Sequence, residues 1–288
     1  YAFIYVGIFE YSSPISSYLR NFGIMLPSIK NLYGASVVLS MALFPYIYLL
    51  LRVKLTSVGL DLFRAAKSLG NNNTASIFKV IIPSLFPVII AGMTLVIFET
   101  IADFGGVSTL RIETFTVGIY NAWFGYQSYF SAARLAGYLL IFVFIIIFIA
   151  KYYERKQRNL AQKTSEVFEG MKLVPYKSFL ASLYCSSIFT IVFLIPIGQL
   201  LIWASKENNF LNIENMYLFF NSLTLGVIVS IITVFFGIAL ALAYRSQKKI
   251  RLGISISSSG YAVPGSVISA GLLVSFGYFF KVSITSFG

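Results

Sequence analysis

The sequence predicts an all-α membrane protein, a polytopic bundle of transmembrane helices. Hydrophobic residues make up 58% of the 288 residues and charged residues only 11%, whereas a soluble domain carries roughly 25% charged residues. The mean hydropathy is +0.82. Several apolar runs reach the length of about 20 residues that a helix needs to cross a bilayer. The basic residues also alternate between the segments that join these runs.

Six apolar runs are predicted to span the membrane as helices. They cover residues 34–51, 84–102, 131–150, 179–204, 218–243 and 257–280. Residues 1–9 resemble the tail of a seventh span. A backbone in lipid has to satisfy its own polar groups, so each run is expected to be helical. The chain begins with Tyr1 inside an apolar stretch, and we therefore expect it to be a fragment of a longer chain.

The charges between the runs predict the orientation. Sixteen of the 22 lysines and arginines lie in the segments 52–83, 151–178 and 244–256. Two spans separate each of these segments from the next, so the three share a side, which the positive-inside rule makes the cytoplasm. This predicts a multi-pass membrane protein that is surrounded by lipid. Orientation also explains the net charge of +12, so no nucleic-acid partner is expected.

The residue inventory excludes most catalytic chemistry. The sequence has no histidine, which removes His-based triads and most zinc sites. Its one cysteine, Cys185, lies in an apolar run and is expected to be a buried structural thiol. We predict no catalytic residue, metal site or cofactor. The sequence also lacks a Gly-x-x-x-x-Gly-Lys-Ser/Thr phosphate loop, so ATP hydrolysis would have to come from a separate protein.

The basic segment 52–83 is patterned rather than merely polar. Residues 61–70 have helical propensity, and four apolar side chains recur with helical spacing. These are Leu62, Ala65, Ala66 and Leu69. Gly70 and the three asparagines after it predict a helix stop. Thr74 is expected to cap a second short helix, 75–82, that ends against Pro83. The expected result is two short helices at an angle.

The spacing in this segment resembles the cytoplasmic signature of ABC-importer permeases. That signature is Glu-Ala-Ala, three residues, Gly, nine residues, then Ile-x-Leu-Pro. This chain has Ala65-Ala66, then Gly70, then nine residues, then Val80-Ile81-Ile82-Pro83. It departs from the family at Arg64, where the family has Glu, so any ion pair made by that carboxylate is in doubt.

The resemblance implies that this segment is a coupling loop, which docks in a groove on a separate ABC ATPase subunit. The residues that it implies for this role are Asp61, Arg64, Ala65, Ala66, Gly70, Ile82 and Pro83. The alternative is an amphipathic helix that lies on the lipid surface. A protein without nucleotide chemistry needs such a lever to receive work.

Two further stretches resemble the ferric-iron type of importer permease, which has two fused halves. One comprises residues 99–105 and 114–124, and the other comprises residues 260–267. The resemblance implies the MetI-like fold. Residues 1–151 would then be the C-terminal part of the first half, 152–177 a cytoplasmic linker, and 178–288 a truncated second half. It further implies ferric iron as the solute, a bacterial inner membrane as the location, a periplasmic or extracellular solute-binding protein, and an ATPase dimer.

Two acids at the outer end of the second run are candidates for lining the pathway. Glu99 and Asp103 lie one helical turn apart, and acids in membrane segments tend to face cavities. The alternative is that both are interfacial acids, solvated by water or capping the following turn. Tight metal binding would oppose release from a conduit, so they are not expected to form a metal site.

Three other functions remain open from the sequence. An ion-coupled secondary transporter would need carboxylates or broken helices at mid-depth. An ABC permease could instead carry thiamine, phosphonate, a polyamine or sulfate. An integral membrane enzyme would need a cluster of His, Cys or paired acids, which the sequence does not offer.

Overall fold

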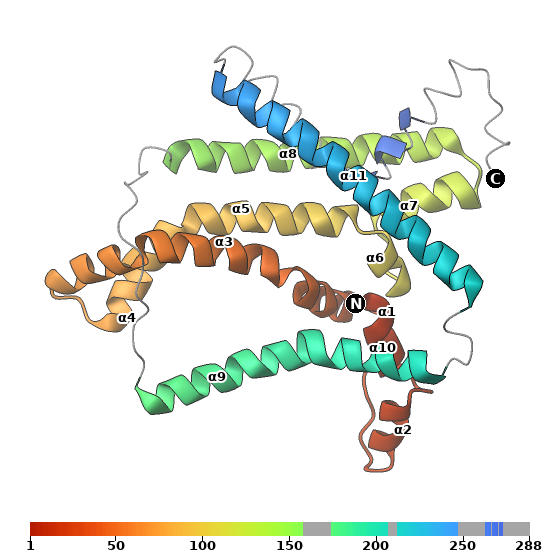
Figure 1. Ribbon diagram of the computed structural model, residues 1–288, viewed down its shortest axis with the longest axis horizontal. Helices are drawn as coiled ribbons and strands as arrows, with labels where there is room; N and C mark the ends of the chain where they lie inside the picture. Colours follow the sequence, from red (N-terminus) through yellow and green to blue (C-terminus); the bar gives the residue numbers. More distant parts are fainter. Residues whose placement is uncertain (158–173, 207–211, 247–262, 266, 270, 273–288) are drawn as a thin grey trace. The chain divides into compact units, whose positions relative to one another are not determined.

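The computed structural model describes residues 1–157, 174–206, 212–246, 263–265, 267–269 and 271–272. All regular structure in these ranges is helical, which confirms the predicted all-α class (Figure 1). Five helices in this part of the chain are long and apolar enough to cross a membrane. They cover Leu32–Thr56, Asn73–Ala102, Tyr129–Ala150, Pro175–Lys206 and Ile213–Ala243. They match the first five predicted runs. The sixth run, 257–280, lies mostly outside the described residues.

The chain divides into two units, which are described separately. The first comprises residues 1–193 and 263–288, and the second comprises residues 194–262. The second unit contains α10 (Ile195–Lys206) and α11 (Ile213–Ser246). None of the residues in the most apolar window of α11 is buried within the protein. Such an apolar, exposed helix suits contact with lipid or with other membrane helices.

Three long helices form the framework of the first unit. They are α3 (Leu32–Ser68), α5 (Ile82–Ala102) and α8 (Tyr129–Gln157). Helix α5 packs against both α3 and α8 (Figure 1). A Cβ atom on Gly92 of α5 would lie 3.0 Å from Cγ1 and 3.3 Å from Cα of Ile47 in α3. The glycine therefore lets the two helices approach closely, as small residues do in membrane bundles.

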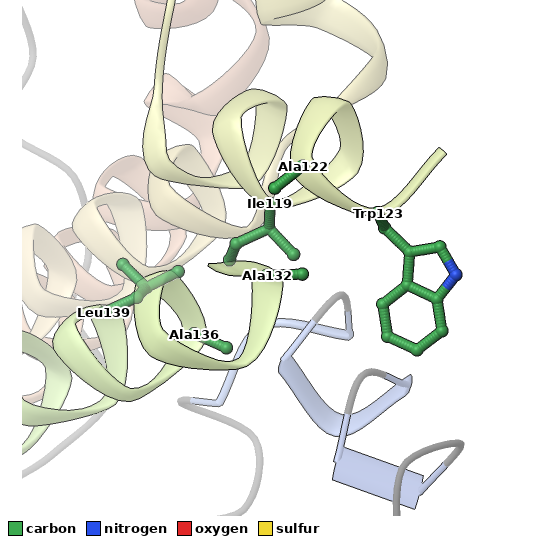
Figure 2. Packing of buried hydrophobic residues seen from close by; sticks show 6 residues of the cluster. All are labelled: Ile119, Ala122, Trp123, Ala132, Ala136 and Leu139. Carbon is green, nitrogen blue, oxygen red and sulfur yellow. The ribbon is translucent and has the colours of Figure 1, made fainter. Parts of the chain in front are cut away.

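Two hydrophobic clusters lie near the ends of these helices. The first joins α7 (Phe115–Tyr120) and the π-helical turn η2 (Asn121–Gly125) to α8. Its buried members are Ile119, Ala122, Trp123, Ala132, Ala136 and Leu139 (Figure 2). The second joins α1 (Ala2–Phe9) to the start of α3 and to Leu110, which follows α6 (Gly105–Thr109). Both clusters lie at the end of the framework opposite the segment that joins α3 to α5.

The described residues between 263 and 272 contact the first cluster through Val267. Pro264 is fully buried, and its carbonyl accepts hydrogen bonds from the N–H groups of Val267 at 2.9 Å and Ile268 at 3.2 Å. A helical turn therefore begins after this proline. Residues 260–262, the first part of the stretch 260–267 that resembles the ferric-iron type of permease, lie outside the described residues.

The fourth predicted span is interrupted by a proline. Helix α9 (Pro175–Phe189) leads into the π-helical turn η4 (Thr190–Leu194), and Pro196 follows at the start of α10. Pro196 has no N–H, so it cannot pair with the carbonyls four and five residues before it. The hydroxyl of Tyr1 donates to the carbonyl of Val192 at 2.7 Å, and that of Tyr5 donates to Ile191 at 2.5 Å. Tyr1, which precedes α1, and Tyr5 of α1 thus each supply a donor to one of these carbonyls.

Helix α9 also corrects the expectation for the cysteine. Cys185 is exposed rather than buried, and no residue of α9 is buried within the protein. The expectation was wrong because an apolar run in a membrane protein can face lipid as well as a core.

Candidate functional site

The segment that joins α3 to α5 begins as a direct continuation of α3. That helix runs without a break for 37 residues, from Leu32 to Ser68. The separate short helix that was predicted from residue 61 is therefore wrong. No proline lies between residues 46 and 68, and extending a helix is easier than nucleating a new one. The backbone is helical at Asp61, but the side chains of residues 57–61 lie outside the described residues.

Gly70 ends α3 as predicted. Its φ angle is +84°, a left-handed conformation that L-residues with side chains adopt with strain. The N–H of Gly70 donates to the carbonyl of Lys67 at 2.9 Å, and the N–H of Asn71 donates to Ala66 at 3.2 Å. These two bonds form a Schellman motif. No atom lies within 4 Å of a Cβ built on Gly70, so its requirement for glycine is conformational.

The second part of the segment differs from the prediction at both of its ends. Helix α4 (Asn73–Ser76) is capped by Asn72, whose side chain accepts a hydrogen bond from the N–H of Ala75 at 2.7 Å. Thr74 is therefore not the cap. Asparagine caps a helix at least as well as threonine does, and Asn72 is the residue that has the extended backbone required of a cap.

The second helix also does not end against Pro83. A π-helical turn, η1 (Ile77–Ile81), carries the chain directly into α5, which begins at Ile82. The N–H of Ile82 donates to the carbonyl of Ile77, five residues earlier. Widening the turn in this way accommodates the missing N–H of Pro83, as π turns often do. Pro83 thus sits in the first turn of a continuous helix.

The surface of the loop is part apolar and part basic. We define the loop tip as the exposed residues Arg64, Ala65, Lys67, Leu69, Phe78 and Lys79. Ala66 and Ser76 are buried behind it, at 2% and 0% exposed. Leu69 is 83% exposed and Phe78 is 65% exposed. Of the four side chains in the predicted stripe, Ala66 and the half-buried Leu62 face inward, whereas Ala65 and Leu69 are exposed. The four side chains with helical spacing therefore do not all share one environment.

The two candidate acids lie at the other end of α5. Asp103 ends that helix, and its Oδ1 accepts a hydrogen bond from the N–H of Gly106 at 3.0 Å. Its backbone oxygen accepts from the hydroxyl of Thr116 at 2.9 Å. A Cβ on Gly106 would overlap the Asp103 carboxylate. Asp103 therefore caps the turn that follows it and ties α5 to α6 and α7.

The other carboxylate oxygen of Asp103, Oδ2, is buried and has no hydrogen-bond partner within the described ranges. Glu99 is half-buried, one turn earlier in α5. Among the residues that the structure describes, no three His, Cys, Asp or Glu side chains lie close enough together to hold a metal ion.

Comparison with known proteins assigns the chain to a protein family. Residues 3–159 match the family model described as "Binding-protein-dependent transport system inner membrane component". The chain belongs to this family. The match includes α3, the loop tip and both acids at the end of α5. With its five apolar helices, this inner membrane component is a multi-pass membrane protein that serves transport.

A curated relative supports the same assignment. The inner membrane component is 26% identical over 257 residues to the "Fe(3+)-transport system permease protein FbpB 2" of Haemophilus influenzae. The alignment covers 85% of this chain and 50% of the relative, so the chain spans about half the length of the relative that it matches. No solved structure matches the chain. The predicted resemblance to ABC-importer permeases of the ferric-iron type is confirmed.

The sequence pattern did not predict that two large apolar side chains of this inner membrane component are exposed on the loop. Leu69 was placed only in the row of apolar side chains with helical spacing, and Phe78 was not singled out. For Leu69 a signal was present, because it directly precedes the helix stop, where no following turn can cover it. For Phe78 the pattern gave no signal, because its direction depends on the π-helical turn η1.

Proposed function

We propose that this chain is the permease of an ATP-binding-cassette importer for ferric iron, driven by a separate ATPase dimer and supplied by a solute-binding protein. The observation that carries the proposal is the loop tip. It presents apolar and basic side chains at the end of one long, uninterrupted helix. An exposed apolar patch with a polar surround is typical of a protein-binding surface.

Helix α3 suits the role of a lever. It has 37 residues and, at about 1.5 Å per residue, is roughly 55 Å long. Its close contact with α5 at Gly92 ties the two helices together. A displacement of the loop tip would therefore move both helices. In this way the closure of the ATPase dimer would change the conformation at the outer end of the pathway.

Individual residues contribute in different ways to this proposed coupling loop. Arg64 and Lys67 are exposed cations, so the groove that receives them would be acidic, in contrast to one that pairs with the family's glutamate. Gly70 sets the turn. Ile82 and Pro83 set where the continuous helix α5 begins. Asp61 stays a predicted member of the loop on the basis of the spacing alone.

The orientation belongs to the same proposal. The segments 52–83, 151–178 and 244–256 would be cytoplasmic because they carry most of the basic residues. The loop tip then meets the ATPase, and Glu99 and Asp103 lie toward the outside. Residues 1–151, 152–177 and 178–288 would be the parts of two permease halves and their linker.

Ferric iron is proposed as the solute because the relative is described as an Fe(3+)-transport permease. Glu99 and Asp103 are proposed to line the pathway. Carboxylate oxygens suit a hard cation, and Oδ2 of Asp103 makes no hydrogen bond to any described residue. A short-lived contact is expected there, since a conduit has to release its solute.

Site-directed crosslinking tests the coupling. Leu69→Cys and the control Tyr126→Cys would be made in a Cys185→Ser background, because both side chains are strongly exposed, at 83% and 80%. A thiol crosslinker should join the ATPase subunit to position 69 and not to position 126. The proposal fails if position 69 captures no ATPase subunit, or if a membrane-impermeant thiol reagent labels position 69 from outside the cell.

A transport assay tests the solute and the energy source separately. Vesicles that contain the complete importer should accumulate radioactive ferric iron only with ATP, the binding protein and an intact ATPase. Iron uptake that persists with an inactive ATPase would favour an ion-coupled secondary transporter. ATP-dependent uptake of thiamine or sulfate without uptake of iron would keep the importer and replace its solute.

A further inference from the structure

A cavity of about 360 Å³ lies beside the segment that joins α1 to α3. It is at the N-terminal end of α3, whereas the loop tip is at the C-terminal end, so it is not part of the coupling loop. Apolar side chains such as Phe9, Met25 and Ile29 form part of its wall. The charged residues on the wall are Glu10, Arg20 and Lys30, which is one carboxylate against two cations.

The guanidinium of Arg20 is fixed in place on this wall. Its Cζ lies 3.6 Å from the centre of the Tyr11 ring, and its Nη2 donates to the hydroxyl of Ser17 at 3.0 Å. Its Nη1 is buried and has no hydrogen-bond partner in the part of the chain that the structure describes. A buried donor without an acceptor is costly, so the position favours an acceptor that the cavity would receive.

Lys30 supplies a second cation on the same wall. Its Nζ lies 3.5 Å from a carboxylate oxygen of Glu10, and the two side chains are 29% and 52% exposed. A pair as exposed as this is weak because water screens it. Lys30 can therefore turn from Glu10 toward an anion in the cavity, and Glu10 would then oppose that anion.

We propose that this cavity binds a phosphate group. The guanidinium of Arg20 lines the cavity and keeps one donor, Nη1, that makes no hydrogen bond to a described residue and suits a phosphate oxygen, and Lys30 adds a point charge. The binding does not depend on the coupling loop and stands or falls apart from the proposed transport function. The phosphate group can belong to a soluble anion or to the headgroup of a membrane lipid.

The surroundings give the lipid source a physical basis. Helix α2 (Pro14–Arg20) and the residues after it expose large apolar side chains beside the cavity. Tyr18, Phe22 and Met25 are 64%, 66% and 83% exposed. Exposed aromatic side chains at the end of a span are typical of headgroup depth, where phosphate groups are concentrated.

The test uses the purified full chain in two arms. In detergent, the protein is titrated with inorganic phosphate and the bound fraction is measured by calorimetry. In nanodiscs of phosphatidylcholine with or without phosphatidylglycerol, the retained phosphatidylglycerol is counted by native mass spectrometry. The variants are Arg20→Gln, Lys30→Gln and Glu10→Gln. The matched control is Arg134→Gln, which removes an exposed arginine of α8 that does not line the cavity.

Arg20→Gln and Lys30→Gln should each weaken binding about tenfold, as expected for a lost charge-assisted hydrogen bond. Glu10→Gln should strengthen binding a few-fold, a gain that misfolding cannot produce. A response to free phosphate in detergent identifies a soluble anion, and retention of phosphatidylglycerol alone identifies a lipid headgroup. The proposal is overturned if wild type binds in neither arm, if the three variants leave binding unchanged, or if Arg134→Gln weakens it equally.

Discussion

The two ends of the α3–α5 pair are built in different ways. The end near α1, α6 and α7 carries both hydrophobic clusters, the fully buried Leu110 and the cap made by Asp103. The other end carries the loop tip, behind which Ala66 and Ser76 are buried while Leu69 and Phe78 stay exposed. One end is held by its own packing, and at the other end no described residue covers the apolar side chains of the loop tip.

This contrast fits the proposed function, in which a permease receives force from an ATPase. A protein that moves as a lever needs a continuous connection, which α3 provides as one helix with Pro45 inside it, and a docking surface that another protein covers. The following predictions test whether the two ends differ in function as they differ in structure, and they run from the largest expected effect to the smallest.

The largest effect is expected at Gly70. Gly70→Val places a β-branched residue at a φ of +84°, where such residues are strained by roughly 1–2 kcal/mol. ATP-driven uptake in vesicles should fall at least about tenfold, while the amount of inserted protein stays unchanged. Gly70→Asn should keep most of the activity, because asparagine tolerates the left-handed conformation.

Gly23 offers the matched control for this strain. Its φ is +76° and, as at Gly70, no atom lies within 4 Å of a Cβ built on it. Gly23→Val therefore introduces similar strain at the opposite end of α3. Uptake should be far less affected than in Gly70→Val. If the two variants lose uptake equally, strain anywhere in the chain is sufficient and the loop has no special role.

The next effect concerns the stiffness of the helix pair. Gly92→Val inserts a side chain that would meet Ile47 at about 3 Å, and overpacking of this kind costs about 1–3 kcal/mol. The thermal unfolding temperature of the purified protein should fall. Gly137→Val in α8 is the control, because no atom lies within 4 Å of a Cβ built there. Equal stability of both variants would show that α3 and α5 do not depend on this close approach.

A smaller effect is expected at Asp103, where two variants distinguish a capping role from a role in lining the pathway. Asp103→Ala removes the bond to the N–H of Gly106 and should cost about 1 kcal/mol of stability. Asp103→Asn keeps an oxygen that can accept that bond, so its unfolding temperature should match wild type. Iron uptake by Asp103→Asn then reports on the charge alone. Normal uptake would mean that the carboxylate is only a cap.

The smallest effect tests the cap of α4. Asn72→Ala removes the acceptor for the N–H of Ala75 and should destabilise this turn by about 0.5–1 kcal/mol. Thr74→Ala should change stability by only a few tenths of a kcal/mol, since the structure gives Thr74 no capping role. The hydrogen-exchange rate of the Ala75 amide measures the stability of this turn in both variants. Faster exchange in Thr74→Ala than in Asn72→Ala would contradict the capping seen here.

The sequence was sufficient for the features that depend on composition over long windows. Four of the five spans were predicted to within five residues at each end, because length and apolarity decide them, whereas the second begins at Asn73 rather than at 84. The stop at Gly70 was predictable because one residue type carries it. The capping alternative for Asp103 was also foreseen, although no pattern could show that its partner would be the N–H of Gly106.

The features that were predicted incorrectly depend on how one helical turn connects to the next. Nothing local distinguishes a helix that restarts at residue 61 from one that continues through it. The choice of Asn72 over Thr74 depends on which residue leaves the turn after Gly70 with an extended backbone. The path through Pro83 depends on a π-helical turn, which has no reliable signature in a single sequence.

The tyrosine bonds to the interrupted fourth span have a consequence for related sequences. Two hydroxyls near position 1 serve two carbonyls nearly two hundred positions later, and they do so because residue 196 is an imino acid. In a homologue with leucine at that position, its single N–H could pair with one of the two carbonyls, and phenylalanine would then do as well as the tyrosine that serves that carbonyl. Substitutions at these positions are therefore expected to be correlated, which would mark the contact between the two distant segments.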